Sequence, residues 1–369
     1  MAGGHPVLAI DIGGTKMAAG LVEPGGRLAS WAQAETPRGM DAEQLWRTLE
    51  VLLARVLSEA RADPATGLAG VGVGCGGPME WPAGRVSPLN IPAWRSFPLR
   101  ERLQEQFPTV PVRLHNDAIC MAAAEHWRGA GRGRRTMLGM VVSTGVGGGL
   151  VLDGRLINGA TGNAGHIGHV VVDPDGPDCV CGGRGCVEAI ARGPALAAWA
   201  QSQGWRPGQA SATAKDLADD AAHGHPVGLA ALRRAGRALG IAIASATHLC
   251  DLEVVAVGGG LAQAGSLLFD PLEEALRIHA RIAYARDVPV VAAALGQSAG
   301  LIGAAALIFA ADRYWAGGQR LPRRACSRSI ASNRALKLPL PKPSEPCRSI
   351  SSKNTVGRSC TGLVNTCSR

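Results

Sequence analysis

Apolar residues occur along the chain either in short runs that end at glycine or in longer stretches with helical spacing. Residues 7–22 consist of an apolar run, a glycine-rich turn and a second apolar run, which predicts a β-hairpin. Residues 41–60 place leucine and valine side chains on one helical face, and Asp41 with Gln44 three residues later matches a capping box. We therefore expect a helix there that covers a sheet.

Three further segments have strand character. Residues 68–73 and 110–114 are short apolar runs, the first ending at a glycine cluster and the second at Asn116, so we expect buried strands that lead into loops. Residues 137–152 show the same pattern as residues 7–22, an apolar run, a glycine-rich turn and a second apolar run. This repeat indicates an internal duplication, with one such hairpin at the start of each half.

The C-terminal half has mainly helical spacing. It dominates residues 194–249, while residues 252–257 predict a final strand and a last helix is expected near residues 296–312. Together these elements predict an α/β protein with the two-lobed, actin-like (ribonuclease-H-like) fold and an interlobe cleft. We expect a small lobe over residues 1–115, on which the last helix packs back, and a large lobe over residues 116–295.

Length and charge agree with this division. The 369 residues exceed what one hydrophobic core usually supports. The net charge is +9, but residues 313–369 hold twelve Lys or Arg and one acidic residue, which leaves −2 for residues 1–312. A nearly neutral body disfavours a specific nucleic-acid binder, because counterion release needs basic groups clustered on the folded surface. Residues 313–369 lack periodicity, so we expect a disordered basic tail.

The sequence also predicts a cytoplasmic protein without a membrane span. No basic segment followed by an apolar run precedes residue 7, so a secretory signal is not expected. Residues 291–311 are apolar, but they are rich in Ala and Gly and contain Gln297 and Ser298, which favours a buried helix over a span. In a reducing compartment the ten cysteines are expected to be thiols or metal ligands rather than disulfides.

The first glycine-rich turn has the sequence DIGGTK, at residues 11–16. Gly13 and Gly14 let the backbone approach a phosphate closely, and their N–H groups and the Thr15 hydroxyl can donate hydrogen bonds to it. A structural hairpin turn is the alternative. The second turn, STGVGGG at residues 143–149, favours phosphate binding, because two such hairpins can hold a nucleotide between them.

A third glycine cluster follows the predicted strand 252–257. Residues 258–260 are a candidate contact around adenosine, with a simple turn as the alternative. A dinucleotide-binding fingerprint at the second turn is disfavoured, because the segment after that turn is strand-like where the fingerprint requires a helix.

The sequence HND at residues 115–117 follows a predicted strand and precedes an Ala-rich helix. Phosphoryl transfer to a hydroxyl needs one carboxylate within hydrogen-bond reach of it, and Asp117 is suitably placed for this role. The alternative role of Asp117 is the N-cap of the following helix. Asn116 can both donate to and accept from sugar hydroxyls.

Residues 162–188 contain the densest group of metal-ligating side chains. Three thiols and one imidazole lie close in sequence, namely Cys179, Cys181, Cys186 and His169. Four protein ligands make a closed structural zinc site, since no position is left for a catalytic water. The alternative is a loop with buried free thiols. Zinc would order a glycine-rich loop and so hold His169 and Glu188 in position.

These motifs together resemble the ROK family of sugar kinases and related repressors. The resemblance covers about residues 7–311 and rests on DIGGTK, HND, STGVGGG, GHIGH, CVCGGRGCVE and GLIGAA, the last at residues 300–305. Within the family, residues 164–193 are most similar to the bacterial N-acetylmannosamine kinases. The resemblance implies a homodimer and Mg²⁺-ATP-dependent phosphorylation of the 6-hydroxyl of a hexose, with N-acetylmannosamine as the leading substrate.

The resemblance also implies roles for particular residues. The implied ATP contacts are Asp11, Gly13, Gly14, Thr15, Lys16, Thr144, Gly145, Gly147, Gly148 and Gly259. The implied sugar contacts are Asn90, Asn116, His166, His169 and Glu188. Asp117 is the implied catalytic base, and the implied zinc ligands are His169, Cys179, Cys181 and Cys186.

One position departs from the family pattern. Most members carry Glu where this chain has His166, and a neutral imidazole offers one donor and one acceptor where a carboxylate offers only acceptors. Two alternatives therefore stand beside the N-acetylmannosamine kinase: a glucokinase of the same family and a non-catalytic sugar-sensing regulator. The family's repressors carry a DNA-binding helix pair before the first hairpin, where this sequence has six residues.

Overall fold

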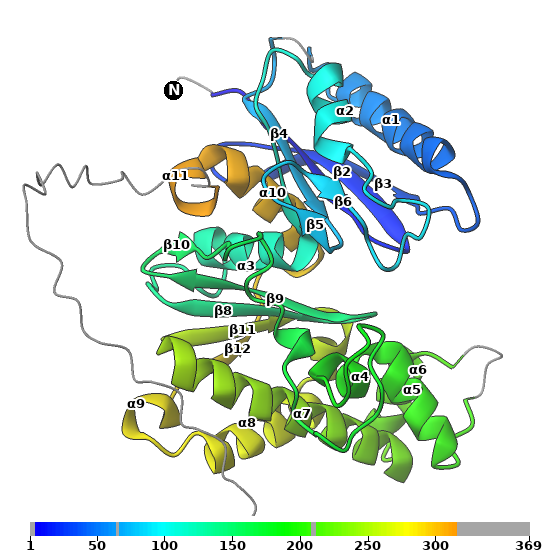
Figure 1. The fold of residues 1–369 in the computed structure, drawn as a ribbon, viewed down its shortest axis with the longest axis vertical. Coiled ribbons are helices and arrows are strands. Elements are labelled where there is room, and N and C mark those ends of the chain that lie inside the picture. The colour runs from blue at the N-terminus through cyan, green and yellow to red at the C-terminus, as the bar shows by residue number, and fades with distance from the viewer. Residues whose placement is uncertain (1–3, 64–65, 208–211, 316–369) are drawn as a thin grey trace, which may run out of the picture. The chain divides into compact units, whose positions relative to one another are not determined.

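The computed structural model describes residues 4–63, 66–207 and 212–315. Two five-stranded sheets form its framework (Figure 1). The first has the order β3-β2-β1-β4-β7 and the second the order β10-β9-β8-β11-β12. In both, an antiparallel hairpin is followed by parallel strands, which is the duplication that the sequence predicts.

The strands have the following bounds. The first sheet consists of β1 Val7–Ile12, β2 Lys16–Val22, β3 Leu28–Glu35, β4 Gly70–Cys75 and β7 Val112–Asn116. The second consists of β8 Met137–Val142, β9 Val146–Leu152, β10 Arg155–Leu156, β11 Val254–Gly258 and β12 Val290–Ala292. A separate two-stranded ribbon pairs β5 Met79–Glu80 with β6 Arg85–Val86.

Helices connect these strands. The α-helices are α1 Ala42–Glu59, α2 Leu99–Gln106, α3 Asp117–Arg128, α4 Val187–Ala191, α5 Gly193–Ser202, α6 Ala214–Ala222, α7 Pro226–Cys250, α8 Ser266–His279, α9 Ala283–Arg286, α10 Ala299–Phe309 and α11 Ala311–Tyr314. Short 3₁₀ turns are η1 Ile167–His169, η2 Gly260–Ala264 and η3 Gly296–Ser298. The predicted capping box of α1 is present, because Asp41 and Gln44 exchange side-chain and backbone hydrogen bonds.

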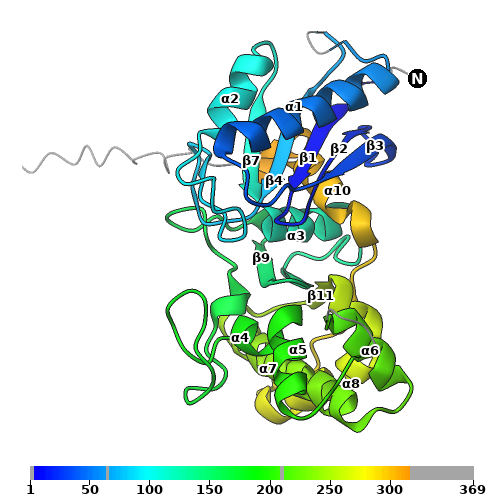
Figure 2. The ribbon, with the colours of Figure 1, turned by 90° about the vertical axis from the view of Figure 1, so that its right-hand side faces the viewer.

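The two faces of each sheet are covered by different helices (Figures 1 and 2). Side chains alternate along β1, so Leu8 and Ile10 pack toward α1 while Val7 and Ala9 pack toward α10. In the second sheet, one face packs against α7 and α8, and the other packs against α3 and α10. The helices α3 and α10 therefore form a shared layer between the sheets.

Glycines allow very close packing in this shared layer. A Cβ atom on Gly72 of β4 would lie 2.0 Å from the Ala304 carbonyl oxygen of α10. A Cβ atom on Gly303 of α10 would lie 1.8 Å from the Cys120 carbonyl oxygen of α3. Because no side chain fits at either distance, both glycines are required by packing rather than by backbone conformation.

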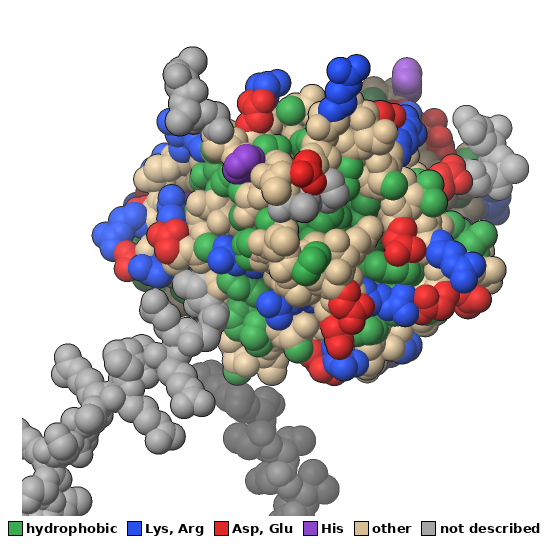
Figure 3. All heavy atoms as spheres, turned by 90° about the horizontal axis from the view of Figure 1, so that it is seen from above, with side chains coloured by type: hydrophobic (Ala, Val, Ile, Leu, Met, Phe, Trp, Pro, Cys, Tyr) green, Lys and Arg blue, Asp and Glu red, His purple; other side chains and the backbone are tan. Residues whose placement is uncertain are grey.

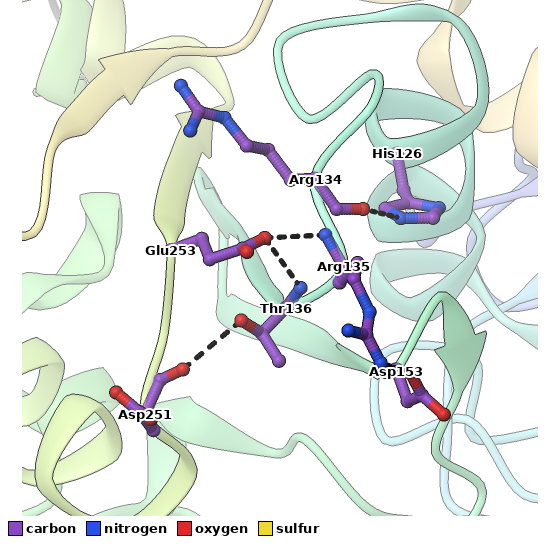
Figure 4. A network of polar contacts seen from close by, with 7 residues as sticks. All are labelled: His126, Arg134, Arg135, Thr136, Asp153, Asp251 and Glu253. Atoms are coloured by element: carbon purple, nitrogen blue, oxygen red, sulfur yellow. Dashed lines mark hydrogen bonds and ion pairs between the residues drawn. The ribbon is translucent and has the colours of Figure 1, made fainter.

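A polar network fixes the connection from α3 to β8 (Figure 4). The Glu253 carboxylate accepts hydrogen bonds from the backbone N–H groups of Arg135 (2.5 Å) and Thr136 (3.1 Å). Thr136 donates its hydroxyl to the Asp251 carbonyl, and Arg135 pairs with Asp153. These contacts tie the start of β8 to the start of β11.

Several predicted elements differ in the structure. The helical region 194–249 contains three helices, which end near Gly204, Gly224 and Cys250; both glycines have a positive φ. The strand predicted at 252–257 is not the final one, because β12 pairs with it in parallel. The three residues of β12 are too few to give a readable period.

The predicted disordered tail begins too early. Arg313 and Tyr314 belong to α11, where Tyr314 is fully buried and the Arg313 guanidinium donates to the Gly154 carbonyl. The remainder of the predicted tail, residues 316–369, lies outside the described residues.

The predictions on charge and on membrane spans can be compared with the described residues. On the face in Figure 3, acidic and basic side chains are interspersed. Among the described residues, no helix is both long and apolar enough to cross a bilayer.

Candidate active site

The first glycine-rich turn joins β1 to β2. Its backbone is closed by a hydrogen bond from the Gly13 N–H to the Lys16 carbonyl (3.0 Å), and the Thr36 hydroxyl donates to the Gly13 carbonyl (2.7 Å). Thr15 and Lys16 are exposed, and the Lys16 ammonium donates to the Gln297 side chain (3.2 Å). The turn thus lies beside the segment that precedes α10.

Asp11 lies at the end of β1 directly under this turn. A Cβ atom on Gly300 of α10 would lie 2.2 Å from the Asp11 carboxylate, so the absence of a side chain at Gly300 provides the space for Asp11. Burial raises the pKa of Asp11 to about 7, and the neighbouring Asp117 charge adds to this while Lys16 opposes it. The Asp117 carboxylate is therefore close enough to Asp11 to raise the pKa of Asp11.

Asp117 is the first residue of α3, and Asn116 is its N-cap. The Asn116 side-chain oxygen accepts from the N–H groups of Ala118 (3.0 Å) and Ile119 (3.4 Å). The alternative role considered for Asp117, the N-cap, is therefore taken by Asn116. Burial raises the pKa of Asp117, and its hydrogen bond from the Ala118 N–H (2.8 Å) partly opposes that shift.

The second glycine-rich turn joins β8 to β9 and contacts the same helix terminus. A Cβ atom on Gly147 would lie 2.7 Å from the Ala118 methyl group, so this strand lies directly against the first turn of α3. The Glu188 carboxylate on α4 accepts from the Val146 N–H (2.9 Å) and lies beside Gly145. Asp117 is thus located between the two predicted turns.

The other predicted nucleotide residues differ in their surroundings. Thr144 is exposed, whereas Gly148 is buried, where a Cβ atom would lie 2.7 Å from the Gly139 carbonyl. Gly259 is exposed after β11, has φ +91°, and lies against the backbone of Val142. Gly259 therefore lies at the same edge of the second sheet as the turn 143–145.

The predicted sugar residues come from the end of β7 and from loops and helices that follow strands of both sheets. Asn90 is exposed and lies against Gly14 and Gly76. Asn116 lies beside Gly77, as does His166, whose ring stacks on His169 with a centroid distance of 6.1 Å. The His166 Nε2 atom is buried and has no hydrogen-bond partner among the described residues, so it is available to a ligand.

The four predicted zinc ligands are brought together. Their ligand atoms all lie within 4.8 Å of one another, with 3.9 Å between Cys179 Sγ and His169 Nδ1 and 3.9 Å between the sulfurs of Cys181 and Cys186. A tetrahedral zinc with bonds of about 2.3 Å separates its ligands by roughly 3.7 Å. The donor set and spacing therefore fit zinc.

Three side chains near these groups have no role in the sequence prediction. Gln297 contacts Lys16, and Gly300 makes room for Asp11; both are near or within the GLIGAA motif. His115 is the first residue of HND and is fully buried beside Asn116. For Gly300 and His115 the only available signal was their position in a motif, and Gln297 had none, because each acts through a contact distant in sequence.

The comparisons with known proteins agree with this arrangement. A model of the ROK family matches residues 7–311. An N-acetylmannosamine kinase of Yersinia pseudotuberculosis is 36% identical over 300 residues, which are 81% of this chain and 96% of the relative. A glucokinase of Thermotoga maritima is 34% identical over 315 residues, with 82% and 96% covered.

A solved structure gives the same result for the fold. The ROK family glucokinase from Streptomyces griseus, in complex with glucose and AMPPNP, is 32% identical, with a TM-score of 0.71 and coverage of 82% of this chain and 98% of that one. The family model spans most of the sequence, and both curated relatives exceed 30% identity over four fifths of it. This chain therefore belongs to the ROK family of sugar kinases and has its two-lobed, actin-like α/β fold.

Proposed function

We propose that this protein transfers the γ-phosphoryl group of Mg²⁺-ATP to the 6-hydroxyl of a hexose, with N-acetylmannosamine as the preferred substrate. The observation that carries the proposal is the position of Asp117, at the N-terminus of α3, beside Asp11 of the first turn and the Gly147 strand of the second. A nucleotide held by two glycine-rich turns would present its phosphate where this carboxylate can accept a proton.

Each proposed step has a residue of this chain to perform it. The hydroxyls of Thr15 and Thr144, both exposed, would bind phosphate oxygens, and Mg²⁺ would neutralise their charge. The Gly13 N–H is not free for this role, because it donates to the Lys16 carbonyl. Asp117 would accept the hydroxyl proton as the bond to phosphorus forms. Proton removal is late in a loose phosphoryl-transfer transition state, so positioning of the acceptor matters more than a special basicity.

The proposed sugar site combines the end of β7 with the loop that holds Asn90, with η1 and with α4. Asn90, Asn116 and His166 would bind hydroxyls, and His169 and Glu188 would complete the set. Glu188 uses one carboxylate oxygen for the Val146 N–H, so its other oxygen is the one proposed to face the sugar. We further propose that residues 1–115 together with α10, and residues 116–295, act as the two lobes that close on the substrates.

Two relatives of similar identity act on different sugars by name, so glucose is the second candidate substrate. His166 supports N-acetylmannosamine, since its imidazole can donate one hydrogen bond and accept another. A coupled assay that compares N-acetylmannosamine, N-acetylglucosamine and glucose tests this choice. A higher kcat/KM for glucose would make the protein a glucokinase, and no ATP turnover with any hexose would favour the sugar-sensing regulator.

The proposed base is tested with Asp117→Asn. This change removes the proton acceptor but keeps the side-chain volume, so kcat should fall about 10²- to 10⁴-fold while the hexose Kd changes little. The matched control is Asp153→Asn, on the exposed Arg135 pair of the second sheet, which should leave kcat unchanged. Wild-type kcat in the Asp117 variant would exclude this residue as the base.

We also propose that a zinc ion binds His169, Cys179, Cys181 and Cys186 and stabilises the loop between η1 and α4. When bound, zinc would supply structural cross-linking only, since four protein ligands leave no open position. The residues of this loop then hold His169 against His166. A homodimer is proposed from the family resemblance and is tested by measuring the mass in solution.

A further inference from the structure

The imidazole of His115 joins two segments that are far apart in sequence. His115 is the penultimate residue of β7, directly before Asn116 and Asp117, and is 0% exposed. Its Nδ1 atom lies 2.9 Å from the Asn116 backbone nitrogen, and its Nε2 atom lies 2.9 Å from the Asn158 side-chain oxygen. Both ring nitrogens are thus used by protein groups.

These two contacts fix the tautomer of the ring. The Asn116 backbone N–H can only donate, so Nδ1 must be the acceptor and Nε2 must carry the proton. Nε2 then donates to the Asn158 oxygen, as the distance requires. Burial lowers the pKa of His115 to about 4, so the ring is neutral around neutral pH and both hydrogen bonds are made.

Asn158 lies at the base of the loop that leads to His166. Its carbonyl accepts from the Ala164 N–H (3.2 Å), which closes the segment 158–164 into a compact loop. His166 follows immediately, in the position proposed for sugar binding. A single hydrogen bond from His115 therefore connects the strand end of the first sheet to the loop that carries His166.

Two tryptophan rings pack beside this connection. Trp81, from the β5–β6 ribbon, lies 6.0 Å from the His115 ring, and Trp315 packs edge-on at 6.4 Å. Trp81 also lies under the loop, because a Cβ atom on Gly162 would be 2.1 Å from the Trp81 Cβ atom. His115 is fully buried and Asn158 half-buried, so loss of this bond leaves the His115 ring nitrogen unpaired in the protein interior, which is costly.

We propose that His115 is a positioning residue, which holds the proposed base Asp117 and the proposed sugar ligand His166 in register through Asn158. This inference rests on the proposed function, since the register matters only if one sugar contacts both groups. Catalytic groups must be placed to within a fraction of an ångström, and displacements of about 1 Å cost up to about 10²-fold in rate. The reacting carboxylate itself is not touched by His115.

The test compares His115→Leu, Asn158→Ala and the double variant with the wild-type protein. Either single change should lower kcat/KM for the hexose about 10- to 100-fold and raise the hexose Kd measured calorimetrically without ATP, while the KM for ATP stays within about twofold. The kcat/KM of the double variant should equal that of the less active single variant, because both single changes remove the same hydrogen bond. His115→Gln, which keeps an N–H donor, should recover part of the loss.

The matched control is His126→Leu. His126 is 2% exposed and lies in α3, the helix that begins with Asp117. It bonds the Tyr314 hydroxyl at 2.7 Å. It also bonds the Arg134 carbonyl at 2.7 Å (Figure 4). The His126→Leu variant should have a lower Tm than the wild type and an unchanged hexose Kd. Wild-type hexose Kd and kcat/KM in Asn158→Ala, which removes only a half-buried side chain, would overturn the inference even if His115→Leu fails to fold.

Failure of the proposed function gives a different result. A wild-type protein that phosphorylates no hexose contradicts the kinase proposal itself. An active wild-type protein whose Asn158→Ala and His115→Gln variants keep normal hexose constants contradicts only the role of His115.

Discussion

Asn116 and Asp117 are neighbours in sequence but have separate tasks at the start of α3. Asn116 satisfies two backbone N–H groups of the helix, which leaves Asp117 available at the end of β7. The sequence predicts both residues as part of a site. It could not predict which one is the cap, because Asn and Asp cap helices equally well and the backbone conformation decides between them.

Ionisation of the buried Asp11 carboxyl group lowers the stability of the folded protein, and this effect can be measured without any substrate. Its folded-state pKa of about 7 lies above its ordinary value of 3.8, so the folded protein binds the proton more tightly than the unfolded chain. Stability is then lost as the pH rises between these two values. Asp11→Asn removes this loss, so its Tm should exceed that of the wild type by roughly 2 to 6 °C at about pH 8 and by less at about pH 5.

Thermal unfolding without nucleotide or metal, followed across this pH range, measures the difference. Asp270→Asn on α8 is the control, since that carboxylate is exposed and its replacement should leave the Tm nearly constant. The expectation would be contradicted if the Tm difference between Asp11→Asn and the wild type decreased as the pH rises.

At the scale of elements, the hairpins, α1 and the helix after HND could be predicted because their apolar period is long enough to read. The division of residues 194–249 into three helices could have been predicted from two glycines. Gly204 and Gly224 each follow the end of a helix with φ near +90°. The ribbon β5–β6 and the strand β12 could not be predicted, because two or three residues contain no period.

The loop between η1 and α4 gives the next prediction. If zinc binds the His169 and cysteine set, the purified protein should contain about one zinc per chain, and Cys186→Ser should lose most of it. Because this loop holds His169 against His166, the variant should raise the hexose KM about 10-fold and leave the KM for ATP unchanged.

Zinc content is measured by atomic spectroscopy, independently of activity. Cys250→Ser is the matched control, since Cys250 is half-buried at the end of α7 and outside the set. Equal zinc content in wild type and Cys186→Ser would contradict the proposed ligand set.

At the scale of the whole molecule, the two-lobed fold followed from the repeated hairpins, whereas the layer formed by α3 and α10 did not. That layer depends on contacts between segments separated by about half of the chain, such as Gly303 with Cys120. A sequence pattern shows that a helix has an apolar surface. It does not show which two sheets share that surface.

Gly303→Ala tests this shared layer. The added methyl group would collide with the Cys120 carbonyl, so α10 must shift away from α3, at a cost of about 1–3 kcal/mol in the free energy of unfolding. Denaturant unfolding should show a lower midpoint, whereas Gly25→Ala, which has open space around it, should not change it. Equal midpoints for both variants would mean that α10 packs less tightly than described.

The position of α10 has a consequence for synthesis on the ribosome. The face of β1 that carries Val7 and Ala9 is among the first to emerge, but the Leu301 and Ala304 side chains that cover it are among the last of the described chain. One apolar surface of the N-terminal strands therefore stays uncovered until α10 has been synthesised. During that interval we expect chaperones to bind the exposed apolar surface of the nascent chain.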